Sequence, residues 1–397
     1  MPHVVNTDAM VAQGILTPQQ ADVIKRRSRD TMLALVVNIM LTAGIVAASL
    51  GFVFWIADAA GVAALGLLFL LIGSGVLARG SSLYRMLGSA SALVGAGMLC
   101  AGGGFELWDK YPDIAGVAML LVGLATIAGF LVLYFRGPQS LSFVTGSIAL
   151  MGLILHLCGV GILLDSSGVT GWIQSLHFLY AAAAIAAVGT ALDVRVVTAA
   201  AIVPFAQALE TGTWYFHAAY VFYSPEPTLT ILQMAALIGV AVWIISRMSD
   251  RLGRHAGILA IMAAVVGNLA FLVGSLWGDD VGMSFFRDSA PSYTDFENWQ
   301  DHTAAYAVWR DQFFQISEHA FSIVWAILLF VGAWFAAVSE KRGLFNTVVT
   351  FGAIHAYTQI YETFSDEPMF YALGGLAVIP LAWGIWRLNG RMFQPQT

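Results

Sequence analysis

The feature that most constrains this chain is a series of long apolar runs that recurs along nearly its whole length. A run of about 20 apolar residues is long enough to cross the hydrocarbon core of a bilayer as a helix. Hydropathy predicts twelve such spans, at 32–56, 59–78, 86–107, 114–135, 140–164, 171–191, 195–219, 228–247, 255–277, 319–339, 343–363 and 369–388. We therefore expect an all-α fold, a polytopic transmembrane helical bundle of about 12 spans.

The composition favours the same class of protein. Hydrophobic residues make up 59% of the chain and charged residues 11%, whereas a soluble domain has about 25% charged residues. The short alternating segments of a transmembrane barrel are not seen. Cys100 and Cys158 both fall inside predicted helices and form neither a disulfide framework nor a CxxC motif. The sequence contains no motif that calls for a cofactor, and we expect none.

The positions of the basic residues predict the orientation. With twelve spans and a cytoplasmic N-terminus, all but three of the 18 Lys and Arg residues lie on the cytoplasmic side. The exceptions are Lys110, Arg287 and Arg310. This is the positive-inside pattern, so we expect a multi-pass membrane protein with both termini in the cytoplasm. The chain has no basic arm, which excludes a nucleic-acid partner and leaves the lipid bilayer as the expected one.

The spans divide the chain into five parts. We expect a cytoplasmic N-terminal helical pair at 1–31, transmembrane helices 1–9 at 32–277, a periplasmic loop with an interfacial helix at 278–318, transmembrane helices 10–12 at 319–388, and a cytoplasmic tail at 389–397. In the first part, Thr17, Pro18 and Gln20 have the spacing of a capping box that starts a helix. Two short helices cannot bury a core of their own, so this pair needs the membrane surface, the main body, another protein or a second copy of the chain.

Two stretches resemble a known family. "MVAQGILTPQQADVI", from Met10, is similar to the start of the bacterial domain-of-unknown-function family 2157. "QIYETFSDEPMFYALGGLAVIPLAWGIWRLNGR", from Gln359, resembles the C-terminal helix pair of that family. The resemblance implies a bacterial inner-membrane protein and carries over no activity and no catalytic residue.

Polar residues within the spans are the candidates for function. His355, Gln359 and Glu362 lie at i, i+4 and i+7, hence on one helix face near its predicted outer end. Glu210 and His217 lie in the same way on the predicted span 195–219. Secondary candidates near the same membrane level are Glu106, His177, Glu318 and His319.

Three interpretations of these groups stay open. In the first, they are solvated residues at the level of the lipid headgroups. In the second, they form a path for an ion, a proton or a substrate, in which the carboxylates exchange protons or bind a cation. In the third, they form a metal site. The chain has no recognised metal-ligand spacing, so the metal stays unknown. Among other polar residues, we expect His156 to bond a backbone carbonyl of another helix and Asn268 to form an inter-helix hydrogen bond. Asp193 with Arg195, and Asp250 with Arg251, are expected to be solvated turn charges.

Two functions follow from these readings. The first is a transporter or channel-like protein for a small solute or cation that uses the outer Glu and His groups. The alternative is a non-catalytic membrane subunit or sensor that binds partner proteins through the N-terminal helices and the periplasmic loop. An enzyme ranks third, because no GxSxG elbow and no nucleophile with a histidine partner is recognisable.

Overall fold

The computed structural model describes residues 7–80, 84–168, 172–209, 214–216, 221–223, 226–363 and 368–392. Fifteen α-helices account for most of this part of the chain, together with two antiparallel strand pairs. Nine of the described helices are long and apolar enough to cross a membrane. The expected all-α organisation of a multi-pass membrane protein is confirmed to this extent. The chain forms two compact units, Met1–Gly168 and Val169–Thr397, and each is described by itself.

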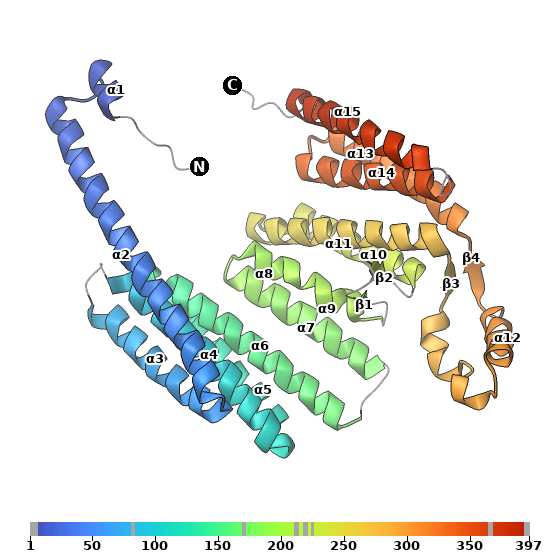
Figure 1. The fold of residues 1–397 in the computed structure, drawn as a ribbon, viewed down its shortest axis with the longest axis horizontal. Coiled ribbons are helices and arrows are strands. Elements are labelled where there is room, and N and C mark those ends of the chain that lie inside the picture. The colour runs from blue at the N-terminus through green and yellow to red at the C-terminus, as the bar shows by residue number, and fades with distance from the viewer. Residues whose placement is uncertain are drawn as a thin grey trace. The chain divides into compact units, whose positions relative to one another are not determined.

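The first unit consists of helices joined by short turns (Figure 1). They are α1 (Thr7–Ala12), α2 (Pro18–Ile56), α3 (Ala59–Arg79), α4 (Arg85–Lys110), α5 (Pro112–Arg136), the 3-10 turn η2 (Gln139–Leu141) and α6 (Ser142–Ser166). The capping box is confirmed: Gln20 N donates to Thr17 Oγ1 at 3.3 Å, and Thr17 N donates to Gln20 Oε1 at 3.0 Å. Beyond this cap α2 runs unbroken to Ile56, so the second helix of the expected N-terminal pair is the first part of α2.

Close packing of α3 on α4 depends on glycines that recur every seven residues. Gly66 and Gly73 are buried on α3 and face an equally spaced buried series on α4 that includes Gly95. A Cβ atom on Gly73 would lie 2.3 Å from Ala92 N, and one on Gly95 would lie 2.3 Å from a backbone nitrogen of α3. Because the spacing is seven residues, the contact follows one seam along two nearly antiparallel helices.

The hairpin of α5 and α6 repeats this arrangement. A Cβ atom on Gly123 would lie 2.4 Å from His156 N, and one on Gly159 would lie 2.4 Å from Leu120 N. The close approach brings the His156 ring against α5, where Nδ1 lies 3.0 Å from the Leu120 carbonyl oxygen and donates to it. The expectation that His156 bonds a backbone carbonyl of another helix is confirmed.

The second unit contains the remaining elements. They are α7 (Trp172–Ala191), α8 (Arg195–Ala200), α9 (Ile202–Gln207), β1 (Trp214–Phe216), β2 (Val221–Tyr223), α10 (Pro227–Arg247), α11 (Asp250–Trp277), β3 (Asp279–Val281), η3 (Met283–Ser289), η4 (Tyr293–Asp295), α12 (Trp299–Arg310), β4 (Phe314–Ile316), α13 (Glu318–Val338), α14 (Arg342–Thr363) and α15 (Pro368–Met392).

The predicted span 195–219 is corrected by this unit. In its described part the chain forms two short helices, α8 and α9, separated at Ala201, and then the strand β1. Pro204 explains the break, because it has no N–H to donate and its ring would clash with the carbonyl of Ala200 in a continuous helix. The apolar helix that remains, Arg195–Gln207, is shorter than a bilayer span.

A buried hydrogen-bond chain holds the turn between α7 and α8 against α11. Thr198 Oγ1 lies 2.6 Å from His255 Nδ1, and His255 Nε2 lies 2.9 Å from Asp193 Oδ1. Arg254 pairs with the same carboxylate at 3.5 Å, and Arg251 donates to the last carbonyls of α7. Asp193 is a turn charge as expected, with its side chain 46% exposed, but it pairs with His255 and Arg254 of α11, and Arg251 bonds the end of α7. Thr198 and His255 are 1% and 2% exposed, which leaves no room for a substrate at the hydroxyl.

The segment 278–318 is closed at its base by the hairpin of β3 and β4, in which Asp279 pairs with Ile316. Between the strands lie η3, η4 and α12. The α12 helix begins with Asn298 as its cap and places the His302 ring among four aromatic side chains, Tyr293, Phe296, Trp299 and Tyr306. The helix expected within 278–318 is α12, at Trp299–Arg310, and β4 follows it.

Candidate functional site

Three helices of the second unit bring polar side chains together inside an apolar bundle. Asn268 comes from α11, Trp325 from α13 and His355 from α14. Trp325 Nε1 donates to Asn268 Oδ1 at 2.8 Å, and the His355 ring meets the Trp325 ring edge-on, with centroids 4.7 Å apart. We call these three residues the Asn–Trp–His cluster.

The bonding of Asn268 and Trp325 is explained by their surroundings. Trp325 is 1% exposed and stacks on Phe271, with the ring planes 8° apart. A buried indole N–H needs an acceptor, and the Asn268 amide oxygen supplies it. The Asn268 amide nitrogen donates to the Ala264 carbonyl of its own helix at 2.7 Å. The inter-helix hydrogen bond expected of Asn268 is confirmed.

His355 is the member of the cluster with a polar atom left over. Its Nδ1 is buried and has no hydrogen-bond partner among the described residues. Polar atoms buried without a partner are uncommon and costly in native proteins. This nitrogen is therefore a buried polar atom of the cluster whose cost the described residues do not offset.

A cavity of about 200 Å³ adjoins the cluster. Asn268 and Trp325 form part of its wall, and α10, α11, α13 and α14 supply the rest through Met234, Gly267, Leu329 and Val348 among others. A volume of this size holds several water molecules or one small solute. Apart from Asn268 and Trp325, the residues of this wall are apolar.

The α14 candidates become more exposed toward the end of the helix. His355 and Gln359 are half-buried and Glu362 is exposed in the last turn of α14. At about 1.5 Å per residue, Glu362 lies roughly 10 Å along the helix from His355. Glu210 and His217, the candidates of the predicted span 195–219, lie outside the described residues.

The secondary candidates lie in separate places. Glu106 is on α4 in the first unit, where it pairs with Lys110 at 2.8 Å. His177, on α7, has a buried Nδ1 without a partner among the described residues. Glu318 and His319 are exposed at the start of α13, where Glu318 Oε1 lies 3.9 Å from His319 Nε2. Within the described ranges, no group of three or more His, Cys, Asp or Glu residues is placed to hold a metal ion.

A second polar cluster, which sequence reasoning missed, lies where α10 meets the β3–β4 hairpin. Glu226 is fully buried and accepts from Gly282 N at 3.0 Å, and Asp279 accepts from Thr228 N at 2.8 Å. Asp280 pairs with Arg310 of α12. These contacts anchor the segment 278–318 to the helices.

The pKa of Asp279 in this cluster is raised from its ordinary 3.8 to about 6, mainly because the carboxyl group is buried. The neighbouring carboxylates of Glu226 and Asp280 raise this pKa further, whereas the hydrogen bonds from Thr228 lower it.

Trp325 was also missed, although the sequence carried a signal. A tryptophan and an asparagine in separate apolar runs each need a polar partner, so they are candidates to bond each other. Which runs are neighbours is decided by the fold and not by hydropathy.

Comparison of the chain with protein-family models, with curated proteins and with solved structures gives no match.

Proposed function

We propose that this protein transports or conducts a small solute or an ion across a bacterial inner membrane, and that the Asn–Trp–His cluster is part of its path. The observation that carries the proposal is the buried, unpartnered Nδ1 of His355, whose ring packs against Trp325 in the wall of a cavity. Polar groups at membrane depth are costly, and their common role is in substrate or proton pathways. Histidine suits this role because its charge changes near neutral pH.

The arrangement of α14 supports a route to this cluster from one end of the helix. His355, Gln359 and Glu362 lie on one face, and exposure increases from His355 to Glu362. A cation or polar solute that met Glu362 first would then pass Gln359 and reach His355. Glu210 and His217 of the chain before β2 belong to the same proposal as further path residues.

The proposed topology has twelve spans and both termini in the cytoplasm, and in it residues 195–219 cross as an interrupted segment, broken at Ala201. Two observations support this topology. Most Lys and Arg residues fall in the turns that it places on the cytoplasmic side, and nine helices among the described residues are long and apolar enough to cross a membrane. The resemblance to the domain-of-unknown-function family 2157 stays a prediction from two short stretches.

A binding experiment on matched histidine variants tests the function. The melting temperature of the purified protein is measured against a panel of ions, pH values and small solutes, for wild type, His355→Gln and His319→Gln. A ligand that binds only the folded state raises apparent stability by mass action. We expect a stabilising ligand for wild type and for His319→Gln, because His319 is 85% exposed, and loss of that stabilisation in His355→Gln.

The contrary result is equally clear. If no condition in the panel stabilises wild type and His355→Gln is at least as stable, then the cluster binds nothing and its role is packing.

A second candidate function is a subunit or sensor that binds partner proteins. It is favoured by exposed apolar side chains on the segment 278–318, of which Trp299 and Phe314 are 66% and 72% exposed. Under this alternative, Trp299→Ser and Phe314→Ser would remove a protein complex and leave the ligand response of the Asn–Trp–His cluster unchanged.

A further inference from the structure

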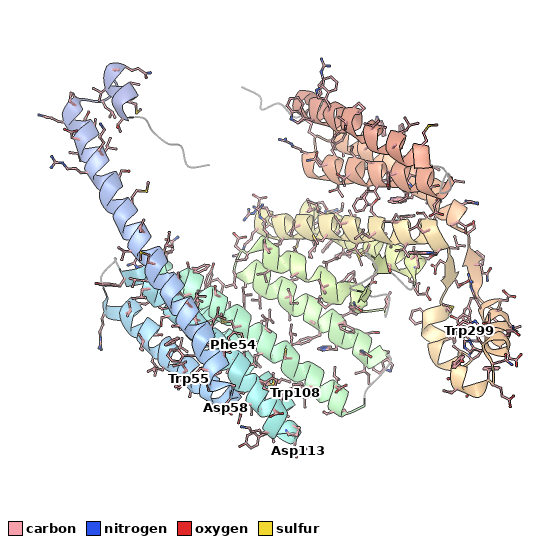
Figure 2. All side chains as sticks on the ribbon, in the orientation of Figure 1. Phe54, Trp55, Asp58, Trp108, Asp113 and Trp299 are labelled. Carbon is pink, nitrogen blue, oxygen red and sulfur yellow. The ribbon has the colours of Figure 1, made fainter. Side chains whose placement is uncertain are left out.

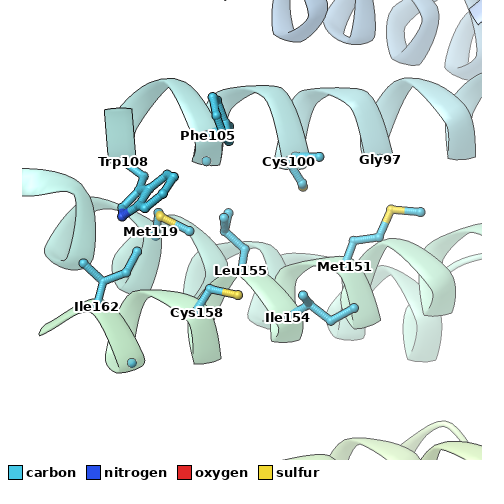
Figure 3. Close-up of a pocket in the computed structure, with 13 residues that line it drawn as sticks. Gly97, Cys100, Phe105, Trp108, Met119, Met151, Ile154, Leu155, Cys158 and Ile162 are labelled. Carbon is cyan, nitrogen blue, oxygen red and sulfur yellow. The ribbon is translucent and has the colours of Figure 1, made fainter. Parts of the chain in front are cut away.

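The first unit contains a groove of about 650 Å³ between α4 and α6, with α5 behind it. Figure 3 shows the side chains of Cys100, Phe105 and Trp108 on α4 and those of Met151 and Cys158 on α6 along its two sides. The volume lies within the range of about 300–1,000 Å³ that is usual for ligand sites. The groove is larger than the cavity of about 200 Å³ beside the Asn–Trp–His cluster, and the proposed transport path does not use it.

The walls of the groove are made almost wholly of carbon and sulfur. Glycines at 97, 104 and 161 leave the space that larger side chains would fill. Met119 and Leu155 are buried in the floor, whereas Phe105, Trp108 and Ile154 on the rim are more than half exposed. The groove is therefore open along one side and can admit a chain laterally. Its walls have too few polar atoms to select a charged or hydrogen-bonding solute.

The length of the groove matches one leaflet of a bilayer. On α4 its wall runs from Gly97 to Trp108, and on α6 from Met151 to Ile162. Each stretch rises about 16 Å at 1.5 Å per residue, which is close to half of a hydrocarbon core of about 30 Å. Gly97 and Met151 lie near the middle of their helices, so the groove extends from mid-membrane to one end of the unit.

Aromatic residues mark that end as a membrane–water interface. Phe54, Trp55 and Trp108 gather there together with Asp58 and Asp113 (Figure 2). Phe54 and Trp55 are 81% and 79% exposed. Aromatic side chains next to charged residues are typical of the headgroup level. The open end of the groove thus lies where the glycerol and headgroup of a lipid would lie.

We propose that this groove binds one acyl chain of a bilayer phospholipid, with the chain end near Gly97 and Met151 and the headgroup near Trp108. An acyl chain fits the apolar walls, the lateral opening and the length of a single leaflet. A transmembrane helix of a second copy fits less well, because it would need a groove along the whole span. The site is independent of the proposed transport path.

Photo-crosslinking with a lipid tests this site. The protein is reconstituted in phosphatidylcholine vesicles that contain a phosphatidylcholine with a diazirine in its acyl chain, and crosslinked peptides are mapped by mass spectrometry. We expect crosslinks to be enriched on the groove faces of α4 and α6 relative to other exposed helix faces. A lipid that merely surrounds the protein would mark all exposed faces alike.

Two glycines provide a matched pair of variants. A Cβ atom on Gly161 in the groove, or on Gly129 on α5, would meet nothing within 4 Å, so Gly161→Phe and Gly129→Phe place the same side chain on a helix without a backbone clash. Gly161→Phe should lose the enriched crosslinks, and Gly129→Phe should keep them. Gly97→Phe is a second groove-filling variant, since its Cβ would meet only the end of the Met151 side chain at 3.9 Å. It replaces Gly161→Phe if that variant does not fold.

Either of two results would overturn the proposal. Crosslinks spread evenly over all exposed faces, or retained after the groove is filled, would mean that no chain occupies it. Protein–protein crosslinks from Cys158 between two copies, in place of lipid crosslinks, would assign the groove to a dimer interface.

Discussion

At the scale of single residues, most polar side chains inside the apolar helices have a specific partner from the backbone or from another helix. His156 uses the Leu120 carbonyl, and Asn268 bonds both Trp325 and its own helix. Such hydrogen bonds between helices contribute about 0.6 kcal/mol on average in a membrane protein. His355 differs because its Nδ1 has no partner among the residues described, and for that reason the proposed function rests on it.

The carboxylate of Asp279 predicts a pH dependence for the anchoring of segment 278–318. Its pKa is raised in the folded protein to about 6, so the folded state favours the protonated form. The stability that this proton contributes is fully present below pH 3.8 and is lost as the pH rises through about 6. Asp279→Asn keeps an oxygen to accept from Thr228 N, so we expect the variant to match wild type near pH 4 and to melt at a higher temperature near pH 7.

Melting curves from about pH 4 to about pH 8 check this prediction. Asp295→Asn is the control, because Asp295 is an exposed residue of the same segment. If wild type and Asp279→Asn respond to pH in parallel, the raised pKa contributes nothing to stability.

At the scale of elements, the first unit is built from two helical hairpins whose glycines approach the facing backbone. The close contacts of α3 with α4 and of α5 with α6 recur every seven residues. Seven residues are nearly two helical turns, so these glycines stay on one face along the hairpin. In lipid, contact between two apolar helix surfaces gives little hydrophobic free energy. Close packing of this kind therefore supplies much of the free energy of helix–helix association.

A pair of glycines on α3 tests this packing. Gly73→Ala places a Cβ atom 2.3 Å from Ala92 N, so we expect it to force the helices apart and to lower the free energy of unfolding by about 2 kcal/mol. Gly75→Ala meets nothing within 4 Å and should be neutral or stabilise by up to about 1 kcal/mol through helix propensity. Unfolding of each variant in mixed micelles with increasing denaturing detergent measures the difference, and equal stabilities would show that the seam is loosely packed.

At the scale of the whole molecule, the segment 195–225 decides the topology. Eight of the nine long apolar helices precede residue 278. If only these cross the membrane, segment 278–318 lies on the same side as the first part of α2. If residues 195–219 also cross, as in the proposed twelve-span topology, the two lie on opposite sides.

Cysteine labelling separates these arrangements. In a background with Cys100→Ala and Cys158→Ala, Ser28→Cys and Thr303→Cys introduce single thiols at exposed positions of α2 and α12. A membrane-impermeant maleimide added to intact cells should label Thr303→Cys, and Ser28→Cys only after the cells are opened. Labelling of both from the same side would contradict the twelve-span proposal.

The class of the protein and the ends of most helices can be predicted from the amino-acid sequence alone. Long apolar runs have one stable outcome in lipid, and local signals such as the Thr17 capping box act within one turn, so both are readable from the chain. The predicted span 195–219 is an exception, and its cause is also local, because Pro204 interrupts an apolar run that hydropathy counts as one span.

Which polar residues meet depends on how the helices pack, and this cannot be read from the sequence. Asn268, Trp325 and His355 are separated by about ninety residues along the chain, and hydropathy cannot say that α11, α13 and α14 are neighbours. Likewise the groove between α4 and α6 exists because α5 and the glycine seams set their separation, and no single helix encodes that distance. Hydropathy is a property of each segment by itself and therefore predicts the helices. A site depends on which helices pack together, and the order of the helices along the chain does not specify this.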